Sequence, residues 1–375
     1  MTGALMVTNT AAGVIQTEEK NFWAIVDAWL EDIKKSKNRK ARTLEVYRYN
    51  LGVFKSWLDA ELIEQPTRQN IKDWKEFMKA KKYSVATINL YLATVRSFYK
   101  WLADNYGVNN VAAGIDGLKR SKEHTRGVLN LADMKTLLNV VVPTAEKKIA
   151  AEKERLEAAQ KEAQSRGKSF HINGLMKRYE KAARLQALRD KAILAVLMGG
   201  ALRTIEVSRL TIADFKRNGG VTILSVLGKG KDAKVDVKIS RQVANTINQW
   251  LSAREAVDVV TNNSPLFCSI GNNSWGETLG SHAVSTLVKF YLEQAGLKNK
   301  NEISTTDCSR IQSKPVTAHS LRASLATESY FNGAKITEIQ QQLRHENLET
   351  TMIYIREADK LKNPCSDIIS AAIFG

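Results

Sequence analysis

Four short patterns in the second half of the chain carry side chains that could act on a phosphodiester. In order they are Arg203-x-x-Glu206, Lys229, His319-x-x-Arg322, and His345 followed nine residues later by Tyr354. Each pattern alone has an ordinary explanation, since residues three apart on a helix commonly form ion pairs or are simply solvated. The information therefore lies in the whole set and in its order.

Together, these residue types are what attack on a phosphodiester by a side-chain hydroxyl requires without a metal. Two arginines can bind the non-bridging oxygens and stabilise the charge of a pentacoordinate transition state. Tyrosine supplies a hydroxyl that later leaves well, because its pKa of about 10 is far below that of an alkanol. Histidine can accept or share the tyrosine proton, and a mobile lysine can donate one to the departing 5′ oxygen.

The segments around these residues predict mainly helices. The apolar run 188–198 predicts a core helix that ends at Gly199 and Gly200, just before Arg203. Further apolar residues at helical spacing predict helices over 131–140, 204–210, 241–256, 281–295, 319–331, 336–343 and 350–355. The chemistry-bearing residues are thus expected mostly on helices or directly beside them.

One β-hairpin interrupts this helical pattern. Residues 221–226 and 234–239 are rich in β-branched side chains, and Val235, Val237 and Ile239 share one face of the second strand. The turn between them carries Lys229 and Lys231 but lacks the spacing of a nucleotide-binding P-loop. We expect Lys229 at the hairpin tip, with Lys231 as the alternative for the same role.

Residues 145–186 are rich in Ala, Glu, Lys and Gln, with 11 basic against 6 acidic side chains. This composition predicts a helix, a break near Gly167 and a second helix, which together would form an inserted hairpin.

The first part of the chain predicts a small helical bundle over 21–35, 43–58, 67–80 and 84–105, with Thr67 and Ser84 as N-caps. Basic residues gather around these helices, with Tyr91, Tyr99 and other tyrosines among them, which favours a face that follows a phosphate backbone. The candidate DNA-binding residues are Lys34, Lys35, Lys37, Arg39, Lys40, Arg42, Lys81, Lys82, Arg96, Lys119, Arg120 and Lys122.

The net charge of the whole chain also favours a nucleic-acid partner. The 375 residues carry 56 Lys and Arg against 39 Asp and Glu, a formal charge of +17, which favours nucleic acid as partner before an anionic membrane surface. The longest apolar run, 192–202, is about half of a bilayer-spanning helix, and residues 1–20 do not form a signal peptide. We therefore expect a cytoplasmic, nucleoid-associated protein with no membrane partner and, from its scattered cysteines, no metal site.

With these motifs in hand, the second region resembles the tyrosine site-specific recombinases, or phage integrase family. The resemblance rests on residues 201–215, 226–239, 317–327 and 343–355, and the N-terminal bundle is similar to the core-binding domain of that family. It implies a mainly α fold with a small antiparallel β-hairpin or sheet (α+β). The expected domains are a leader over 1–19, a core-binding domain over 20–113, a basic linker over 114–126 and a catalytic domain over 127–375, with the boundary placed where two glycines and several basic residues interrupt the helical pattern.

The resemblance also implies roles for the residues. Arg203 and Arg322 would bind the phosphate, Lys229 would be the general acid, and Tyr354 would be the nucleophile. His319 would accept or share the tyrosine proton, and His345 would donate a further hydrogen bond to the phosphate. Glu206 would help to order the site. No cofactor, ATP or metal would be needed. Two features depart from the family pattern: Arg344 stands where a glycine is usual, and 145–186 is longer than expected.

The expected activity is exchange of strands between two double-stranded DNA sites by a homo-tetramer, through a 3′-phosphotyrosyl intermediate and a Holliday junction. Integration or excision, resolution and inversion stay open as its task. Two alternatives remain, a type IB topoisomerase-like relaxase and a non-catalytic basic DNA-binding protein. The tail over 356–375 runs from a polar stretch into apolar residues, which would dock on their own domain or on a neighbouring protomer.

Overall fold

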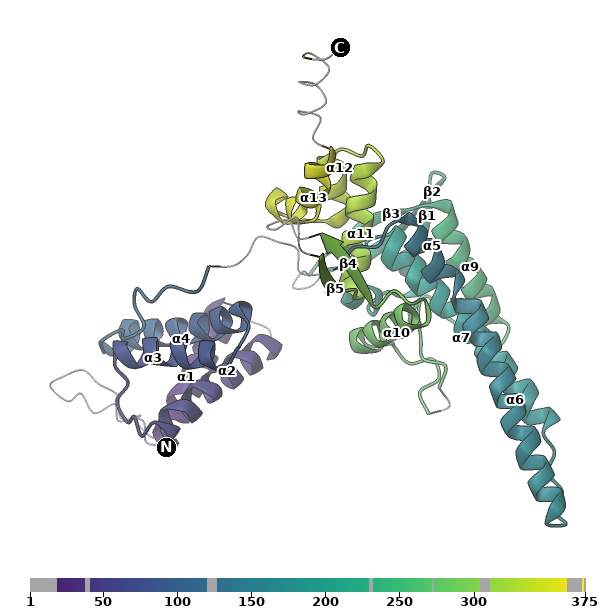
Figure 1. Cartoon of the computed structure of the whole chain (residues 1–375), viewed down its shortest axis with the longest axis horizontal. Helices are drawn as coiled ribbons and strands as arrows, with labels where there is room; N and C mark the ends of the chain where they lie inside the picture. Colours follow the sequence, from purple (N-terminus) through teal and green to yellow (C-terminus); the bar gives the residue numbers. More distant parts are fainter. Residues whose placement is uncertain are drawn as a thin grey trace. The chain divides into compact units, whose positions relative to one another are not determined.

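The computed structural model of the chain describes residues 19–37, 41–119, 127–228, 232–271, 273–303, 311–362 and 373. The chain divides into two compact units, Met1–Lys122 and Glu123–Gly375. Most of the described residues are helical, and two small antiparallel sheets accompany the helices of the second unit (Figure 1). The fold class expected from the sequence, mainly α with a small antiparallel sheet, is confirmed.

The first unit is a bundle of the helices α1 (Glu19–Lys37), α2 (Ala41–Ala60), α3 (Arg68–Ala80) and α4 (Val85–Tyr106). The N-caps Thr67 and Ser84 are confirmed, because each side-chain oxygen accepts a hydrogen bond from a backbone amide of the first turn. Trp29, Phe54 and Trp74 are fully buried among the four helices. These large aromatic side chains give the unit its own core.

The second unit begins with α5 (Leu131–Asn139), α6 (Val141–Ser165) and α7 (Asn173–Gly199). The break near Gly167 and the helix end at Gly199 are as predicted. The sequence interpretation was wrong in treating 188–198 as a separate helix, since it is the second half of the 27-residue α7. No proline or glycine stands between Met176 and Met198, so nothing in the sequence stops the helix there.

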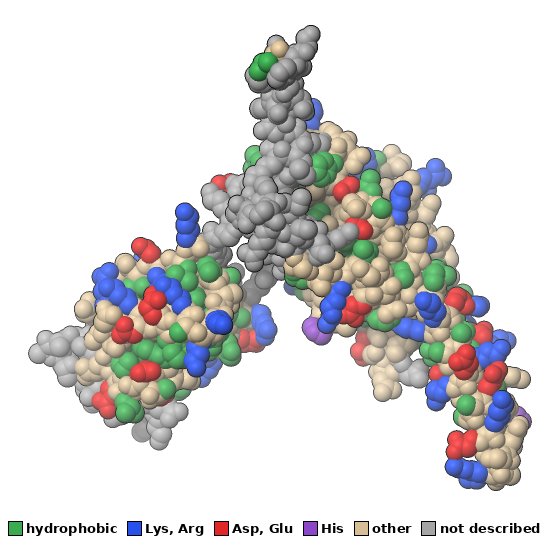
Figure 2. Space-filling view, viewed as in Figure 1, with side chains coloured by type: hydrophobic (Ala, Val, Ile, Leu, Met, Phe, Trp, Pro, Cys, Tyr) green, Lys and Arg blue, Asp and Glu red, His purple; other side chains and the backbone are tan. Residues whose placement is uncertain are grey.

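The two halves of α7 have different surroundings. Its second half, from Ala192 to Met198, is buried in the main core of the unit. Its first half pairs with α6 and, together with it, projects away from the rest of the unit, and we call residues 145–186 the arm (Figure 1). Ile149, Leu156 and Met176 form a narrow apolar seam of the arm, while acidic and basic side chains alternate over its surface (Figure 2).

The predicted hairpin is part of a three-stranded antiparallel sheet, β1 (Phe215–Asn218), β2 (Val221–Leu227) and β3 (Lys234–Ile239). Val237 and Ile239 face the core as expected, but Val235 is 51% exposed. The sequence missed β1 and the pair β4 (Asn299–Ile303) and β5 (Ile311–Pro315). These short, mostly polar strands carry no alternation of apolar residues, and their pairing depends on a neighbouring strand rather than on their own composition.

The remaining helices are α8 (Thr204–Val207), the 3-10 turn η1 (Ile212–Asp214), α9 (Arg241–Glu255), α10 (Ser281–Gln294), α11 (Ala318–Phe331), α12 (Ile336–Leu343) and α13 (Leu348–Lys362). The last helix is longer than expected, because 356–362 continues it instead of forming a flexible polar stretch. Pro364 is the first helix breaker after Tyr354. The apolar tail lies outside the described residues except for position 373. Among the helices described, none is both long enough and apolar enough to cross a bilayer.

Candidate active site

Arg203 is held by the loop that joins the core helix α7 to the short helix α8. It is the N-cap residue of α8, and the buried Glu206 accepts hydrogen bonds from its backbone amide and from its Nη1 atom, both at 2.8 Å. Two residues earlier, Ala201 has a left-handed backbone with φ of 50°. The carbonyl of Ala201 accepts hydrogen bonds from Arg322 and Arg344.

Arg322 lies on α11, one turn after His319, and its side chain is almost fully buried. Its Nη1 donates to the carbonyl of Ala201 and its Nη2 to the carbonyl of Leu343. The guanidinium therefore connects the loop before α8 to the end of α12. Its Nε has no hydrogen-bond partner among the described residues.

Tyr354 lies on α13, packed against α11. Its hydroxyl is 2.8 Å from Nε2 of His319, and its ring centroid is 6.1 Å from that of the histidine. The carbonyl of Tyr354 accepts a hydrogen bond of 3.1 Å from the hydroxyl of Thr327, also on α11. The tyrosine hydroxyl and a possible proton acceptor are thus already in hydrogen-bonding contact.

His345 follows α12 and stands beside the same tyrosine, with ring centroids 5.9 Å apart. Its Nδ1 is 2.9 Å from the hydroxyl of Thr351, which orients the ring. Burial, followed by the positive charges of Arg322 and Arg203, lowers the pKa of His345 to about 4. The imidazole is therefore neutral at physiological pH.

This lowered pKa predicts a specific pH dependence of stability. The unfolded chain takes up the proton at its ordinary pKa of about 6.5, so between pH 6.5 and the folded pKa of about 4 only the unfolded state is protonated. Stability should fall as the pH drops through this window, and the contribution of His345 is complete above it. A His345→Gln variant should show a shallower fall in urea-unfolding free energy, and parallel curves for both proteins would contradict this assignment.

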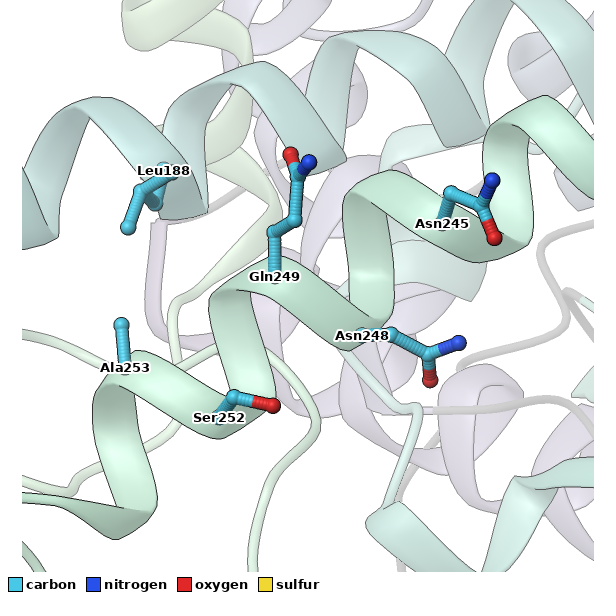
Figure 3. A pocket seen from close by; sticks show the side chains of 6 residues that line it. All are labelled: Leu188, Asn245, Asn248, Gln249, Ser252 and Ala253. Atoms are coloured by element: carbon cyan, nitrogen blue, oxygen red, sulfur yellow. The ribbon is translucent and has the colours of Figure 1, made fainter.

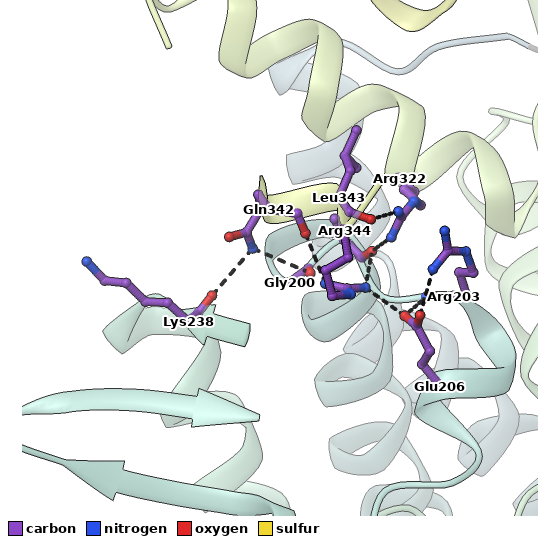
Figure 4. Close-up of polar contacts among 9 residues, drawn as sticks. Gly200, Arg203, Glu206, Lys238, Arg322, Gln342, Leu343 and Arg344 are labelled. Atoms are coloured by element: carbon purple, nitrogen blue, oxygen red, sulfur yellow. Dashed lines mark hydrogen bonds and ion pairs between the residues drawn. The ribbon is translucent and has the colours of Figure 1, made fainter. Parts of the chain in front are cut away.

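The cluster combines the cations Arg203, Arg322 and Arg344 with one carboxylate, Glu206 (Figure 4). Burial, followed by the charges of Arg203 and Arg344, lowers the pKa of the Arg322 guanidinium. Burial alone would raise the pKa of Glu206, but the charge of Arg344 and the hydrogen bonds from Arg203 hold it below its usual value. The excess of positive charge makes the cluster suited to an anion.

The predicted lysines, Lys229 and Lys231, lie outside the described residues. The strands that flank them are described, and Leu227 and Lys234 form the last pair before the turn. The other end is joined to the site, because Nε2 of Gln342 is 3.4 Å from the carbonyl of Lys238 and 3.5 Å from that of Gly200 (Figure 4).

The structure thus brings together Arg203, Glu206, His319, Arg322, His345 and Tyr354. Their individual roles stay predictions. The sequence interpretation noted Arg344 only as a departure from a pattern and overlooked Thr351, which no motif marked. A groove between α7 and α9 shares no residue with this cluster. It is lined by Leu188, Asn245, Asn248, Gln249, Ser252 and Ala253 (Figure 3).

The candidate DNA-binding residues of the first unit divide into several groups. Exposed residues are Lys34, Lys35, Arg42, Lys81, Lys82 and Lys119. Lys34 is paired with Glu31 and Arg42 with Glu45. Arg96 is half-buried and donates to the carbonyl of Ile115 at 3.1 Å. Only the helical backbone of Lys37 is described, and Arg39, Lys40, Arg120 and Lys122 lie outside the described residues.

The tyrosines of this region do not all face solvent. Tyr91 and Tyr99 are each 7% exposed and belong to the core of the bundle. The expectation that they contribute to a phosphate-following face was wrong for these two, because a helix carries its aromatic core residues at the same spacing as a surface stripe.

Comparison with known proteins finds relatives of both parts of the chain. The profile of the phage integrase family matches residues 166–360, and that of the phage integrase N-terminal SAM-like domain matches residues 26–105. The tyrosine recombinase slr0733 of Synechocystis sp. is 29% identical over 187 residues, which cover 50% of this chain and 53% of that protein. The tyrosine recombinase XerD of Listeria innocua is 23% identical over 335 residues, covering 88% and 93%.

Two solved structures share the fold. The XerH site-specific recombinase in its post-cleavage complex with palindromic difH substrate matches with a TM-score of 0.61 and 17% identity, covering 94% of this chain and 90% of that one. The lambda integrase tetramer bound to a Holliday junction matches with a TM-score of 0.58 and 15% identity, covering 89% and 76%. Since the family profile spans more than half of the chain and the expected residues meet in one cluster, the chain belongs to the phage integrase family of tyrosine recombinases.

Proposed function

We propose that this chain is a site-specific recombinase that exchanges strands between two double-stranded DNA sites. The observation that supports this most strongly is the hydroxyl of Tyr354 in contact with His319, beside a buried cluster rich in arginine. Attack of that hydroxyl on the scissile phosphate would form a 3′-phosphotyrosyl bond and release a 5′ hydroxyl. The 5′ hydroxyl of a partner strand would then attack the bond and free the tyrosine.

In this reaction Arg203 and Arg322 bind the non-bridging oxygens of the phosphate, and His319 takes the proton of the tyrosine. His345, neutral and fixed by Thr351, donates a further hydrogen bond. Because the phosphotyrosyl ester conserves the energy of the phosphodiester, the exchange requires neither ATP nor a metal ion.

The active assembly in this proposal is a homo-tetramer that acts at the nucleoid, in the cytoplasm. Support for the tetramer comes from the fold that the chain shares with the lambda integrase tetramer on a Holliday junction. The segment after α13 docks on a neighbouring protomer and so couples the placement of one Tyr354 to the state of the next protomer. Deletion of residues 366–375 tests this coupling, since it should lower assembly and recombination together.

The experiment that tests the function is trapping of covalent protein–DNA junctions in cells, followed by sequencing, which identifies the DNA site and the cleaved bond. The trapped site then serves in a nicked suicide substrate in vitro. Joining of two such sites through a Holliday junction distinguishes a recombinase from a topoisomerase-like relaxase. If no adduct forms on any site, the chain is a DNA-binding protein without this chemistry.

The general acid is assigned to Lys229 at the hairpin turn. Lys229→Ala should slow cleavage of an ordinary phosphodiester by roughly 10²–10⁴-fold, the usual effect of a positioned proton donor. A substrate with sulfur at the 5′-bridging position should restore the rate, because a thiolate leaves without protonation. Rescue of Lys231→Ala in place of Lys229→Ala would transfer the role to Lys231.

We assign the arm to contacts with DNA or with other protomers that form only when two DNA sites are paired. Replacing residues 151–181 by a short Gly-Ser linker removes most of the seam around Leu156 and Met176 but retains Ala145 and Leu185, which belong to the main core. Cleavage of a single nicked site should be unchanged, while synapsis or site preference should change. Recombination equal to that of the parent would make the arm a neutral spacer.

A further inference from the structure

Arg344 combines a backbone suited to glycine with a large, enclosed side chain. It is the C-cap residue of α12 and has φ of 54° and ψ of 46°, in the left-handed region that glycine adopts most easily. Its side chain is only 13% exposed. A position that favours glycine is thus occupied by a residue that must bury a charge, which indicates that the side chain has a use here.

The contacts of Arg344 are all with acceptors of the protein itself. Its Nη1 donates to the carbonyl of Gln342 at 2.9 Å, and its Nη2 donates to the carbonyl of Ala201 at 3.3 Å and to Oε2 of Glu206 at 2.7 Å (Figure 4). The terminal nitrogens are therefore engaged before any DNA binds. This distinguishes Arg344 from Arg203, whose side chain is 33% exposed and has one bonded terminal nitrogen among the contacts described.

Glu206 lies between the two arginines. Its Oε1 accepts from Arg203, and its Oε2 accepts both from the backbone amide of Arg203 and from Arg344. The carboxylate is 1% exposed, so its charge must be balanced by these neighbours. With Arg203 as its only partner, Glu206 would form a pair with no net charge. With Arg344 added, the group keeps one net positive charge, and Arg203 can offer it to a phosphate.

Arg344 is also connected to the second phosphate-binding arginine. The carbonyl of Ala201 accepts hydrogen bonds from both Arg322 and Arg344. The residue therefore joins the loop that carries Arg203 to the segment between Leu343 and His345, at a point where both backbones are left-handed. Loss of its side chain would leave Glu206 paired with Arg203 only and would remove one of the contacts between the end of α12 and that loop, while those of Arg322 and Gln342 would remain.

We propose that Arg344 is a positioning residue for DNA cleavage, which shares the charge of Glu206 so that Arg203 remains a net cation facing the scissile phosphate. This inference rests on the proposed function of the same site. It assigns to Arg344 a role that glycine at the same position could not fill.

The test is Arg344→Gly, which removes the side chain and suits the left-handed backbone. Cleavage of the nicked suicide substrate is measured in single turnover, next to DNA affinity and thermal unfolding. Cleavage should slow by about 10–100-fold, the scale of effects from small misplacements of reacting groups, while DNA affinity is retained. Arg344→Lys, which keeps the charge but cannot bind two acceptors in a plane, should fall between the two proteins.

Two further measurements separate positioning from mere stability. On a substrate whose scissile phosphate is a neutral methylphosphonate, the deficit of Arg344→Gly should shrink, because less positive charge is needed. In a Glu206→Gln background, Arg344→Gly should cost less than in the parent, since the charge that it balances is gone. Arg155→Gln is the control, because Arg155 also forms an ion pair with a glutamate, Glu152, but lies exposed on the arm.

The outcomes are distinct. Cleavage by Arg344→Gly at the parental rate would overturn the inference and leave the proposed function intact. A deficit of equal size on both substrates, accompanied by a lower unfolding temperature, would make Arg344 a structural anchor and also overturn it. Absence of any adduct with the parent protein would refute the proposed function and the inference that depends on it.

Discussion

Tyr354→Phe is expected to abolish the covalent protein–DNA adduct and to leave DNA binding nearly unchanged. The substitution removes a single oxygen, the one 2.8 Å from Nε2 of His319, and retains the ring that packs beside Ile355 and Ala323. The lost hydrogen bond should cost on the order of 1 kcal/mol of stability, too little to unfold the domain. The measurement is adduct formation on a nicked suicide substrate, resolved on a denaturing gel, beside a binding assay at the same salt concentration.

The matched control is Tyr291→Phe in the same unit. Tyr291 is also buried, and its hydroxyl donates to Asp190 at 2.9 Å, so this variant loses a comparable hydrogen bond away from the cluster. It should form adducts at the parental level after correction for stability. Adducts with Tyr354→Phe would place the nucleophile elsewhere.

Arg322→Ala should lower the rate of cleavage by roughly 10³–10⁵-fold, the range for an arginine that stabilises a phosphoryl transition state. It removes a buried cation from the site that, in the proposed function, receives the phosphate charge. It also leaves the carbonyls of Ala201 and Leu343 without this donor, which adds a loss of stability. Single-turnover cleavage and thermal unfolding have to be measured together so that these two effects can be separated.

A methylphosphonate at the scissile position provides this separation, because it removes one negative charge from the substrate. The deficit of Arg322→Ala should be smaller on this substrate if the arginine acts on phosphate charge. Arg254→Ala is the matched control: Arg254 is 2% exposed and donates to the carbonyl of Pro265 at 2.6 Å, outside the cluster. It should lose stability with no substrate-dependent change in rate. Equal deficits of Arg322→Ala on both substrates would restrict that arginine to a structural role.

Several local sequence signals were reliable, because the interaction that decides the structure lies within one turn or one strand. Thr67 and Ser84 cap their helices because a side-chain oxygen and an amide three residues later belong to the same turn. Gly199 and Gly200 end α7, and the alternation of Val237 and Ile239 forms a strand. The spacing of His319 and Arg322 also placed them one turn apart on the same helix.

Signals that depend on partners distant in the chain were less informative. The sequence placed Tyr91 and Tyr99 on a binding face, whereas helix packing placed them in the core. The strand β1 was missed because β2 determines its pairing. In each case the residue types allow two solutions, and the free energy of burial against a distant segment selects one.

The residue types of the site, their order and most of the helices that carry them could be predicted from the sequence, because these depend on spacing within single elements. How the buried charges are shared follows from the folded structure alone. Glu206 receives Arg344 from a position 138 residues later, and the carbonyl of Ala201 receives Arg322 and Arg344 together. A buried carboxylate must be balanced by whichever cations the packing brings to it, and that packing is not written in any local pattern.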